Sequence, residues 1–443
     1  MAALHRSAAA IGAVLWLAAA PAGAEPPAPP PVHLGVATCG GSNCHGASER
    51  PAGSSVPGNE YVIWSKRDKH RQAYTVLLDE RAVRMARALG LPDAANQKLC
   101  LDCHADNVPP EQRGRLFQLA DGVGCEACHG GAANWLGVHI SGAGHRDNLA
   151  AGLYPTEQPV ARAEKCLGCH FGDKTRFVDH RLIGAGHPRL GFELDTFTAI
   201  QPAHVVVDKD YIERKGRITD IEVWAIGQAV ALVKRMDALL DPKRAQRGLF
   251  PELALYDCQS CHHPYDALHA PRPTGSGLGP GTVKLNDANV VMLQAAAARV
   301  APAAARSLGA HVLALHRATA QDQGGDPSGV RREAAALRET AQGLVPLLAG
   351  HDFSSGDIRA LAEAVIALGN GPDGWRFSHA EQTTMALEAI TAALKSSGVV
   401  SAAQGEAIKK AMDALYASFA NEASFRPEAF AAALRDVQRA IGR

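Results

Sequence analysis

The chain has 443 residues, with 45 Lys and Arg balanced by 45 Asp and Glu, and only 5% of its residues are aromatic. This length predicts two or three domains. Zero formal net charge and the lack of a basic tract argue against a dedicated nucleic-acid-binding protein. The small aromatic fraction suggests that something other than side chains fills part of the interior.

The amino terminus has the pattern of a secretory signal peptide. His5 and Arg6 precede an apolar stretch over residues 8–20, and residues 22–24 form a small-residue cleavage site. We expect removal of residues 1–24, a mature chain that starts at Glu25, and a periplasmic location. No later run is long enough to span a bilayer, so we expect no transmembrane span in the mature chain.

All ten cysteines follow a Pro-rich spacer over residues 25–38 and occur in five pairs, each followed directly by histidine. The first pair reads Cys-x4-Cys-His and the other four read Cys-x-x-Cys-His. The cysteines are Cys39 and Cys44, Cys100 and Cys103, Cys125 and Cys128, Cys166 and Cys169, and Cys258 and Cys261, and the histidines are His45, His104, His129, His170 and His262.

This spacing is typical of covalent haem attachment. Two thiols add to the two vinyl groups on one porphyrin edge, and the next residue, histidine, binds the iron from one face. Disulfides and zinc ribbons also use paired cysteines, but neither predicts the histidine. The pattern therefore predicts five covalently attached haem c groups with the five motif histidines as proximal ligands.

Each iron also needs a sixth ligand unless that position is left open for chemistry. Enough other histidines lie in the same part of the chain to supply all five, and our candidates for distal ligands are His70, His139, His145, His180 and His187. His70 is expected on a helix over residues 64–77 with Asp68 as its cap. The reserve histidines are His33, His204 and His269; His263 directly follows a proximal ligand and is expected at the surface.

Two stretches carry a family resemblance: Gly122-Val-Gly-Cys-Glu-Ala-Cys-His-Gly130, followed by Trp135-Leu and His139, and Gly184-Ala-Gly-His187-Pro-Arg-Leu. With the other motifs, they resemble multihaem cytochromes c related to the tetrahaem electron carrier of ammonia-oxidising bacteria, the partner of hydroxylamine oxidoreductase. The resemblance covers roughly residues 32–273. It implies closely stacked haems, mostly with two histidine ligands, and single-electron transfer; His70, His139 and His187 match distal ligands of the family. This chain differs by its fifth site, its Cys-x4-Cys-His motif and its long carboxy-terminal extension.

The predicted fold class is all-α. Residues 39–273 are expected to form a haem-packed cytochrome domain with short helices and little regular sheet, in which porphyrin makes up much of the core. An amphipathic helix over residues 218–240 is expected to pack on the haems. A linker over residues 274–285 leads to an α-helical bundle of unknown role over residues 286–443.

The bundle is predicted from strong helical periodicity and a high alanine content. The expected helices cover residues 287–300, 303–320, 329–348, 357–368, 380–395, 402–420 and 427–441. Capping boxes at Ser378 to Glu381 and at Ser401 to Gln404 support two of the helix starts.

Two functions remain open at this level. The first is a periplasmic multihaem cytochrome that relays electrons between periplasmic or membrane-bound redox proteins, as in anaerobic respiration. The alternative is an oxidoreductase in which one five-coordinate haem acts on a small nitrogen or sulfur oxyanion. The relay is favoured because the spare histidines suffice for five irons and because the Cys-x-x-Cys-Lys motif of pentahaem nitrite reductases is absent. We assign no catalytic residue.

Overall fold

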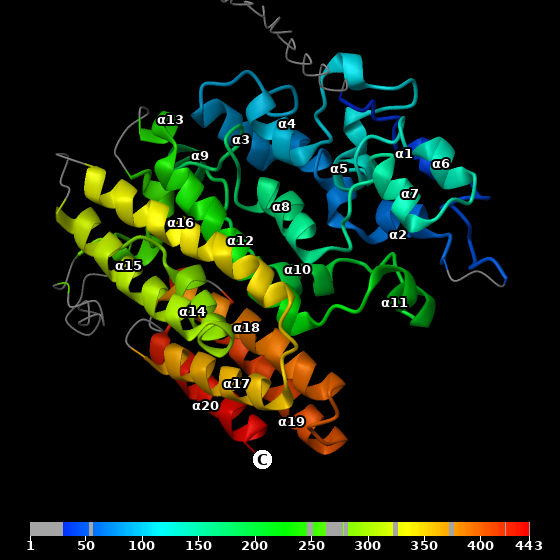
Figure 1. Ribbon diagram of the computed structural model, residues 1–443. Helices are drawn as coiled ribbons and strands as arrows, with labels where there is room; N and C mark the ends of the chain where they lie inside the picture. The colour runs from blue at the N-terminus through cyan, green and yellow to red at the C-terminus, as the bar shows by residue number, and fades with distance from the viewer. Residues whose placement is uncertain are drawn as a thin grey trace, which may run out of the picture.

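The computed structural model describes residues 30–52, 56–245, 251–262, 278, 282–321, 327–371, 376–420 and 422–442. Over these residues the fold is all-α, as predicted, and the only β pairing consists of three isolated bridges. The predicted signal peptide, His263 and His269 lie outside the described residues. Figure 1 shows the short helices of the first half above the long helices of the second half.

The part of the chain that contains the first four cysteine motifs consists of short helices separated by loops. They are α1 (Val36–Cys39), α2 (Glu60–Arg67), α3 (Glu80–Ala88), α4 (Lys98–His104), α5 (Cys125–His129), α6 (Leu136–Ile140), α7 (His145–Ala150), α8 (Pro159–His170), α9 (His180–Gly184), α10 (Leu194–Ile200) and α11 (Lys209–Lys215). Their own apolar core is small and rich in alanine, around Leu77, Ala82, Ala86 and Leu101. The small number of buried apolar side chains agrees with the expectation that a group other than side chains fills this half.

The predicted helix over residues 64–77 is wrong. α2 ends at Arg67, and Asp68 has an extended backbone. Its carboxylate accepts the N–H of His70 and so caps the 3-10 helix η1 (Lys69–Gln72), which η2 (Thr75–Leu78) follows. Aspartate favours such a break because its side chain competes for nearby backbone N–H groups.

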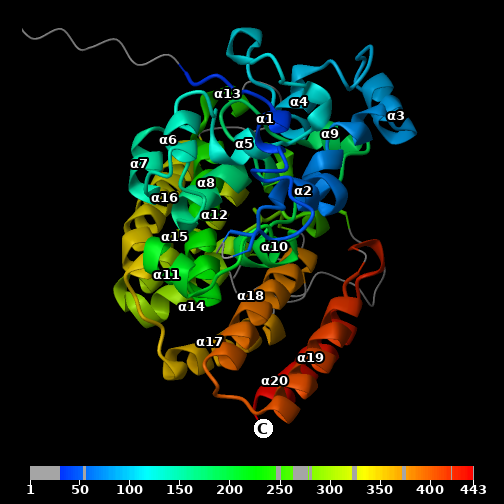
Figure 2. The same cartoon turned by 90° about the vertical axis from the view of Figure 1, so that its right-hand side faces the viewer.

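The central helix of the molecule is α12 (Asp220–Leu240), close to the predicted range of 218–240. Thr219 caps its start, and the helix ends before Pro242. It packs against α8 and α10 of the motif half and against α14, α16 and α18 of the second half, and Figures 1 and 2 both show it between these groups. It is therefore buried on nearly all sides, with Trp224 and Leu232 fully inaccessible.

The second half consists of long helices. After α13 (Pro242–Ala245), η5 (Leu253–Leu255) and η6 (Cys258–Ser260) come α14 (Ala288–Val300), α15 (Pro302–Gln321), α16 (Ser328–Ala349), α17 (Ser355–Asn370), α18 (Phe377–Ser396), α19 (Ala402–Ala417) and α20 (Pro427–Ile441). These confirm the helices predicted from periodicity.

Neither of the two predicted capping boxes forms in full; at the second one the Gln404 side chain donates to the carbonyls of Ala440 and Ile441 instead of closing the box. Ser401 does cap α19, where its side chain accepts the N–H of Gln404. Ser378 does not cap α18, because that helix already begins at Phe377 after Arg376. The Ser378 hydroxyl instead donates to the Asp257 carboxylate at 2.9 Å. A long-range polar contact thus replaces the local one.

One apolar core runs through both halves. It extends from Ala163 and Leu167 on α8, through α12, to Ile441 on α20. This core crosses the predicted linker over residues 274–285, so the bundle packs directly on the motif half rather than apart from it. The predicted domain boundaries remain predictions.

Candidate functional site

Three cysteine motifs form the last turn of a helix. α4, α5 and α8 each end on the motif histidine: His104, His129 and His170. One helical turn brings both thiols and the following imidazole to the same end of the helix. The first motif instead makes a turn after α1, and the fifth lies on η6. All ten cysteines are free thiols.

Every motif histidine faces a second histidine at nearly the same distance. The ring centroids are 5.9 Å apart for His45 and His139, 6.2 Å for His170 and His70, 6.3 Å for His262 and His180, 6.4 Å for His104 and His187, and 6.4 Å for His129 and His204. The structure thus brings four of the five distal candidates to a motif histidine: His70, His139, His180 and His187.

These separations fit an iron between the two rings. A metal–imidazole nitrogen bond is about 2.0 Å, so two imidazoles on opposite sides of one metal ion have ring centres roughly 6 Å apart. Direct stacking of two aromatic rings requires no such uniform spacing, and three of the five pairs are perpendicular, at 88°. The residues present therefore fit haem bound by two histidines.

Hydrogen bonds orient four of these imidazoles for binding through Nε2. Nδ1 of His45 donates to Glu60, and Nδ1 of His70 donates to Asp68, both at 2.9 Å. Nδ1 of His104 donates to the Ala73 carbonyl at 2.9 Å, and Nδ1 of His187 donates to the Pro188 carbonyl at 2.7 Å. A metal-binding histidine usually donates its other ring N–H to a carboxylate or carbonyl in this way.

The structure places His145 and His204 differently from the sequence-based expectation, and the choice of distal ligands remains a prediction. His145 Nε2 lies 2.8 Å from the Glu157 carboxylate, and its ring has no contact with a motif histidine among the described residues. His204, only a reserve in the sequence, faces His129 instead. His204 lies on the loop after α10, far from His129 in the chain, so no local spacing marks it.

Burial keeps the inner imidazoles neutral, which is the form that binds iron. Desolvation, followed by the nearby His204, lowers the pKa of His129 to about 4. Desolvation and the neighbouring His70 lower the pKa of His170 to about 4. The pKa of His45 and that of His70 are raised, mainly by hydrogen bonds to Glu60 and Asp68.

Thiols of different motifs lie next to one another. The Cys39 and Cys125 thiols share a hydrogen bond that lowers the pKa of Cys39 and raises that of Cys125. Cys103 and Cys169 share another, which lowers the pKa of Cys169 to about 7. The attachment edges of the first and third sites, and of the second and fourth, are therefore adjacent.

Among the described residues, no three His, Cys, Asp or Glu side chains converge on a point where they could hold a metal ion. The cysteine pairs therefore do not combine into the four-ligand sites of zinc ribbons. The paired rings found here are instead the arrangement that haem iron requires, because the porphyrin supplies the other four nitrogens.

A buried carboxylate inside the third motif holds the segment that precedes the first motif. Glu126, only 2% exposed, accepts the backbone N–H groups of Leu34, Gly35 and Ala132, each at 2.7 Å. This clamp places α1, and with it Cys39, beside Cys125. A glutamate within a Cys-x-x-Cys-His motif thus has a positioning role that spacing alone does not indicate.

The second half of the chain anchors the fifth motif. Asp257, next to Cys258, accepts the Ser378 hydroxyl, and its N–H donates to the Lys284 carbonyl at 2.9 Å. The Gln259 side chain accepts the N–H of Phe377 at 2.8 Å. The bundle therefore forms part of the wall of this site.

The chain is similar over residues 39–130 to the family described as cytochrome c554 and c-prime. This similarity supports a c-type cytochrome with covalently bound haem, a role in electron transfer, and redox proteins as partners. No curated protein and no solved structure matches the chain. None of the described helices is both long and apolar enough to cross a membrane.

Proposed function

We propose that the protein is a periplasmic five-haem c-type cytochrome that relays electrons between redox partners, with every iron held by two histidines. The observation that carries this proposal is the pairing of all five motif histidines with a second imidazole at 5.9 to 6.4 Å. When bound, haem c supplies a one-electron iron couple. The chain supplies the axial ligands and their orientation.

The proximity of the sites supports a relay. Cys39 lies beside Cys125, Cys103 lies beside Cys169, and Cys166 lies close to Cys128. His180 and His187, on one segment, serve the fifth and second sites. When each site is named by its motif histidine, these contacts between neighbouring sites give the spatial order His262, His104, His170, His129 and His45.

The same pairing weighs against an enzyme with an open iron. A second imidazole at each site occupies the position that a substrate would need.

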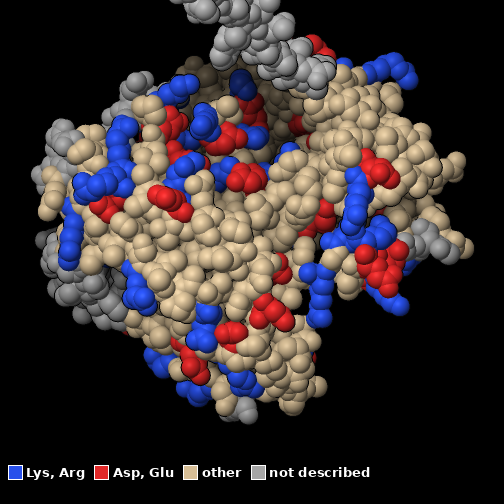
Figure 3. Space-filling view, in the orientation of Figure 1, with Lys and Arg blue, Asp and Glu red and all other residues tan. Residues whose placement is uncertain are grey.

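Figure 3 shows acidic and basic side chains interspersed over one face, without a broad area of one sign that would attract a highly charged partner.

Two measurements test the proposal. The mass of the purified mature protein should equal that of residues 25–443 plus five haems. Electron paramagnetic resonance of the oxidised protein should show only low-spin iron, unchanged by nitrite or hydroxylamine. A high-spin signal that shifts on adding either ligand would favour the enzyme, and a mass without added haem would reject the cytochrome altogether.

A further inference from the structure

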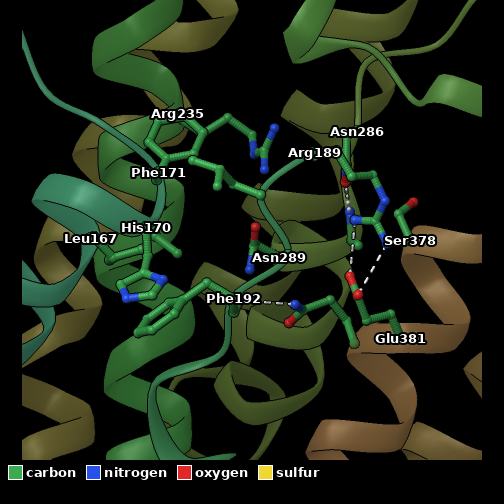
Figure 4. Close-up of a pocket in the computed structure, with 15 residues that line it drawn as sticks. Leu167, His170, Phe171, Arg189, Phe192, Arg235, Asn286, Asn289, Ser378 and Glu381 are labelled. Atoms are coloured by element: carbon green, nitrogen blue, oxygen red, sulfur yellow. Dashed lines mark hydrogen bonds and ion pairs between the residues drawn. The ribbon is translucent and has the colours of Figure 1, made fainter. Parts of the chain in front are cut away.

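Arg235 extends from α12 into a cleft between the two halves of the molecule. The cleft is small, with about 30 Å³ of free space, and it opens to solvent. Its wall includes His170 and Phe171 of the fourth motif region, Arg189, and Asn289 of α14. Figure 4 shows the Arg235 guanidinium reaching toward the Arg189 side of this space.

The Arg235 guanidinium has no ionic partner among the described residues. Its Nε is buried without a hydrogen bond, and its one close contact is with the Phe171 ring, 5.1 Å from the guanidinium carbon. Desolvation lowers the pKa of Arg235 to about 10, with Asp287 and Cys258 acting in the opposite direction, so the group is still charged at neutral pH. The side chain as a whole is half-buried, and a partly desolvated charge gains from a close counter-ion.

The carboxylates around the cleft are already paired with other groups. Glu381 binds Arg189 through two hydrogen bonds of 3.0 and 3.1 Å. Asp287 accepts from His316 at 2.8 Å and also contacts His379 and Arg376, at 3.0 and 2.9 Å. None of these carboxylates is hydrogen-bonded to Arg235, so its guanidinium is available to bind a further anion.

We propose that Arg235 binds a propionate carboxylate of a haem seated beside this cleft, so that the bundle helps to set the reduction potential of that haem. The inference rests on the proposed function, since each haem c brings two propionates. The site is next to His170, the proximal ligand of the fourth motif, and a guanidinium matches a carboxylate with two parallel hydrogen bonds.

The expected effect follows from charge. A cation held at a haem favours the reduced state, which carries one positive charge less. Arg235→Gln should therefore lower one of the five midpoint potentials and leave the other four unchanged. Arg235→Lys, which keeps the charge but not the two-point contact, should give a smaller decrease. Arg338→Gln is the matched control, because Arg338 pairs with Asp237 and does not line the cleft.

The experiment is a spectroelectrochemical titration of the wild type and the three variants, each first shown by mass to carry five haems. One lowered midpoint in Arg235→Gln, and none in Arg338→Gln, supports the proposal. Five unchanged midpoints in a correctly loaded Arg235→Gln protein overturn it and leave the cytochrome function intact. If the affected wild-type midpoint depends on sulfate or phosphate concentration and the variant's does not, Arg235 binds a free anion and the propionate assignment is wrong. A wild-type protein without haem rejects the proposed function itself.

Discussion

The imidazole rings of His129 and His204 lie 6.4 Å apart with their planes at 88°, although one ends α5 and the other lies on the loop after α10. The contact joins the first half of the motif region to the segment that leads into the central helix. It makes His204 the histidine nearest to the third motif histidine and therefore the proposed sixth ligand of that site.

Replacing His204 by alanine should convert one low-spin haem to high-spin, because the iron facing His129 would lose its sixth ligand. His145→Ala is the matched control and should leave all five haems low-spin, since His145 Nε2 is bound to Glu157. Electron paramagnetic resonance of the two oxidised variants measures this directly. The opposite result, a change in His145→Ala and none in His204→Ala, would restore the ligand suggested by sequence alone.

The contribution of Asp195 to stability should fall as the pH rises from about 4 to about 8. Burial and the nearby Glu193, Asp220 and Glu388 raise the pKa of Asp195 to about 8, with Arg162 acting in the opposite direction. The unfolded value is about 3.9. Between these two pKa values the Asp195 carboxyl is protonated in the folded state and ionised in the unfolded state. The free energy of unfolding therefore falls by about 1.4 kcal/mol for each pH unit across this range.

Urea unfolding of the oxidised protein at pH 5 and at pH 8 measures this loss. Asp195→Asn should reduce the difference between the two pH values. Part of the difference should remain, because burial also raises the pKa of Glu193, to about 7. Asp210→Asn, at a surface ion pair with Arg214, should keep the wild-type pH dependence. An equal pH dependence in Asp195→Asn and the wild type would mean that Asp195 is not the group responsible.

Glu126→Ala should destabilise the protein by about 3 kcal/mol, because it leaves buried backbone N–H groups without an acceptor. Limited proteolysis should then cut near Leu34 and Gly35, which the carboxylate holds in the wild type. Thermal unfolding gives the size of the loss. Glu111→Ala, at an exposed position, should match the wild type in both measurements; an undisturbed amino-terminal segment in Glu126→Ala would show that the clamp is not needed.

A chain that ends at residue 285 should fail to accumulate as a folded monomer. It lacks α14 to α20, so the buried face of α12 with Trp224 and Leu232 would be exposed to solvent. Periplasmic yield, gel filtration and haem stoichiometry test this. A monomeric fragment with five haems would instead show that the two halves fold independently.

The sequence predicted the helices of the second half well because long periodic segments with polar breaks encode them locally. The ends of α14, α16 and α20 fall within two residues of the expected positions. The helix expected around His70 failed because Asp68 captures a backbone N–H and ends α2. The local signal at Ser378 was overridden by its bond to Asp257.

The candidate site likewise combines histidines that the sequence predicts with histidines that it does not. Adjacent residues define the proximal histidines, so the motif alone indicates them. A distal ligand comes from elsewhere in the chain, and its choice depends on packing. His145 and His204 show the limit: neither has a distinctive local pattern, and only the positions of Glu157 and His129 separate them.

His180 and His187 stand at the two ends of α9 and its following turn, where they face His262 and His104. The Arg81 guanidinium donates to the Gly186 carbonyl at 2.6 Å and ties this segment to α3. The other end is tied too, because the His180 N–H donates to Glu252 at 3.0 Å. Since one short segment held at both ends carries both imidazoles, we expect a displacement of one ring to shift the other, so that the second and fifth proposed sites respond together to a docked partner.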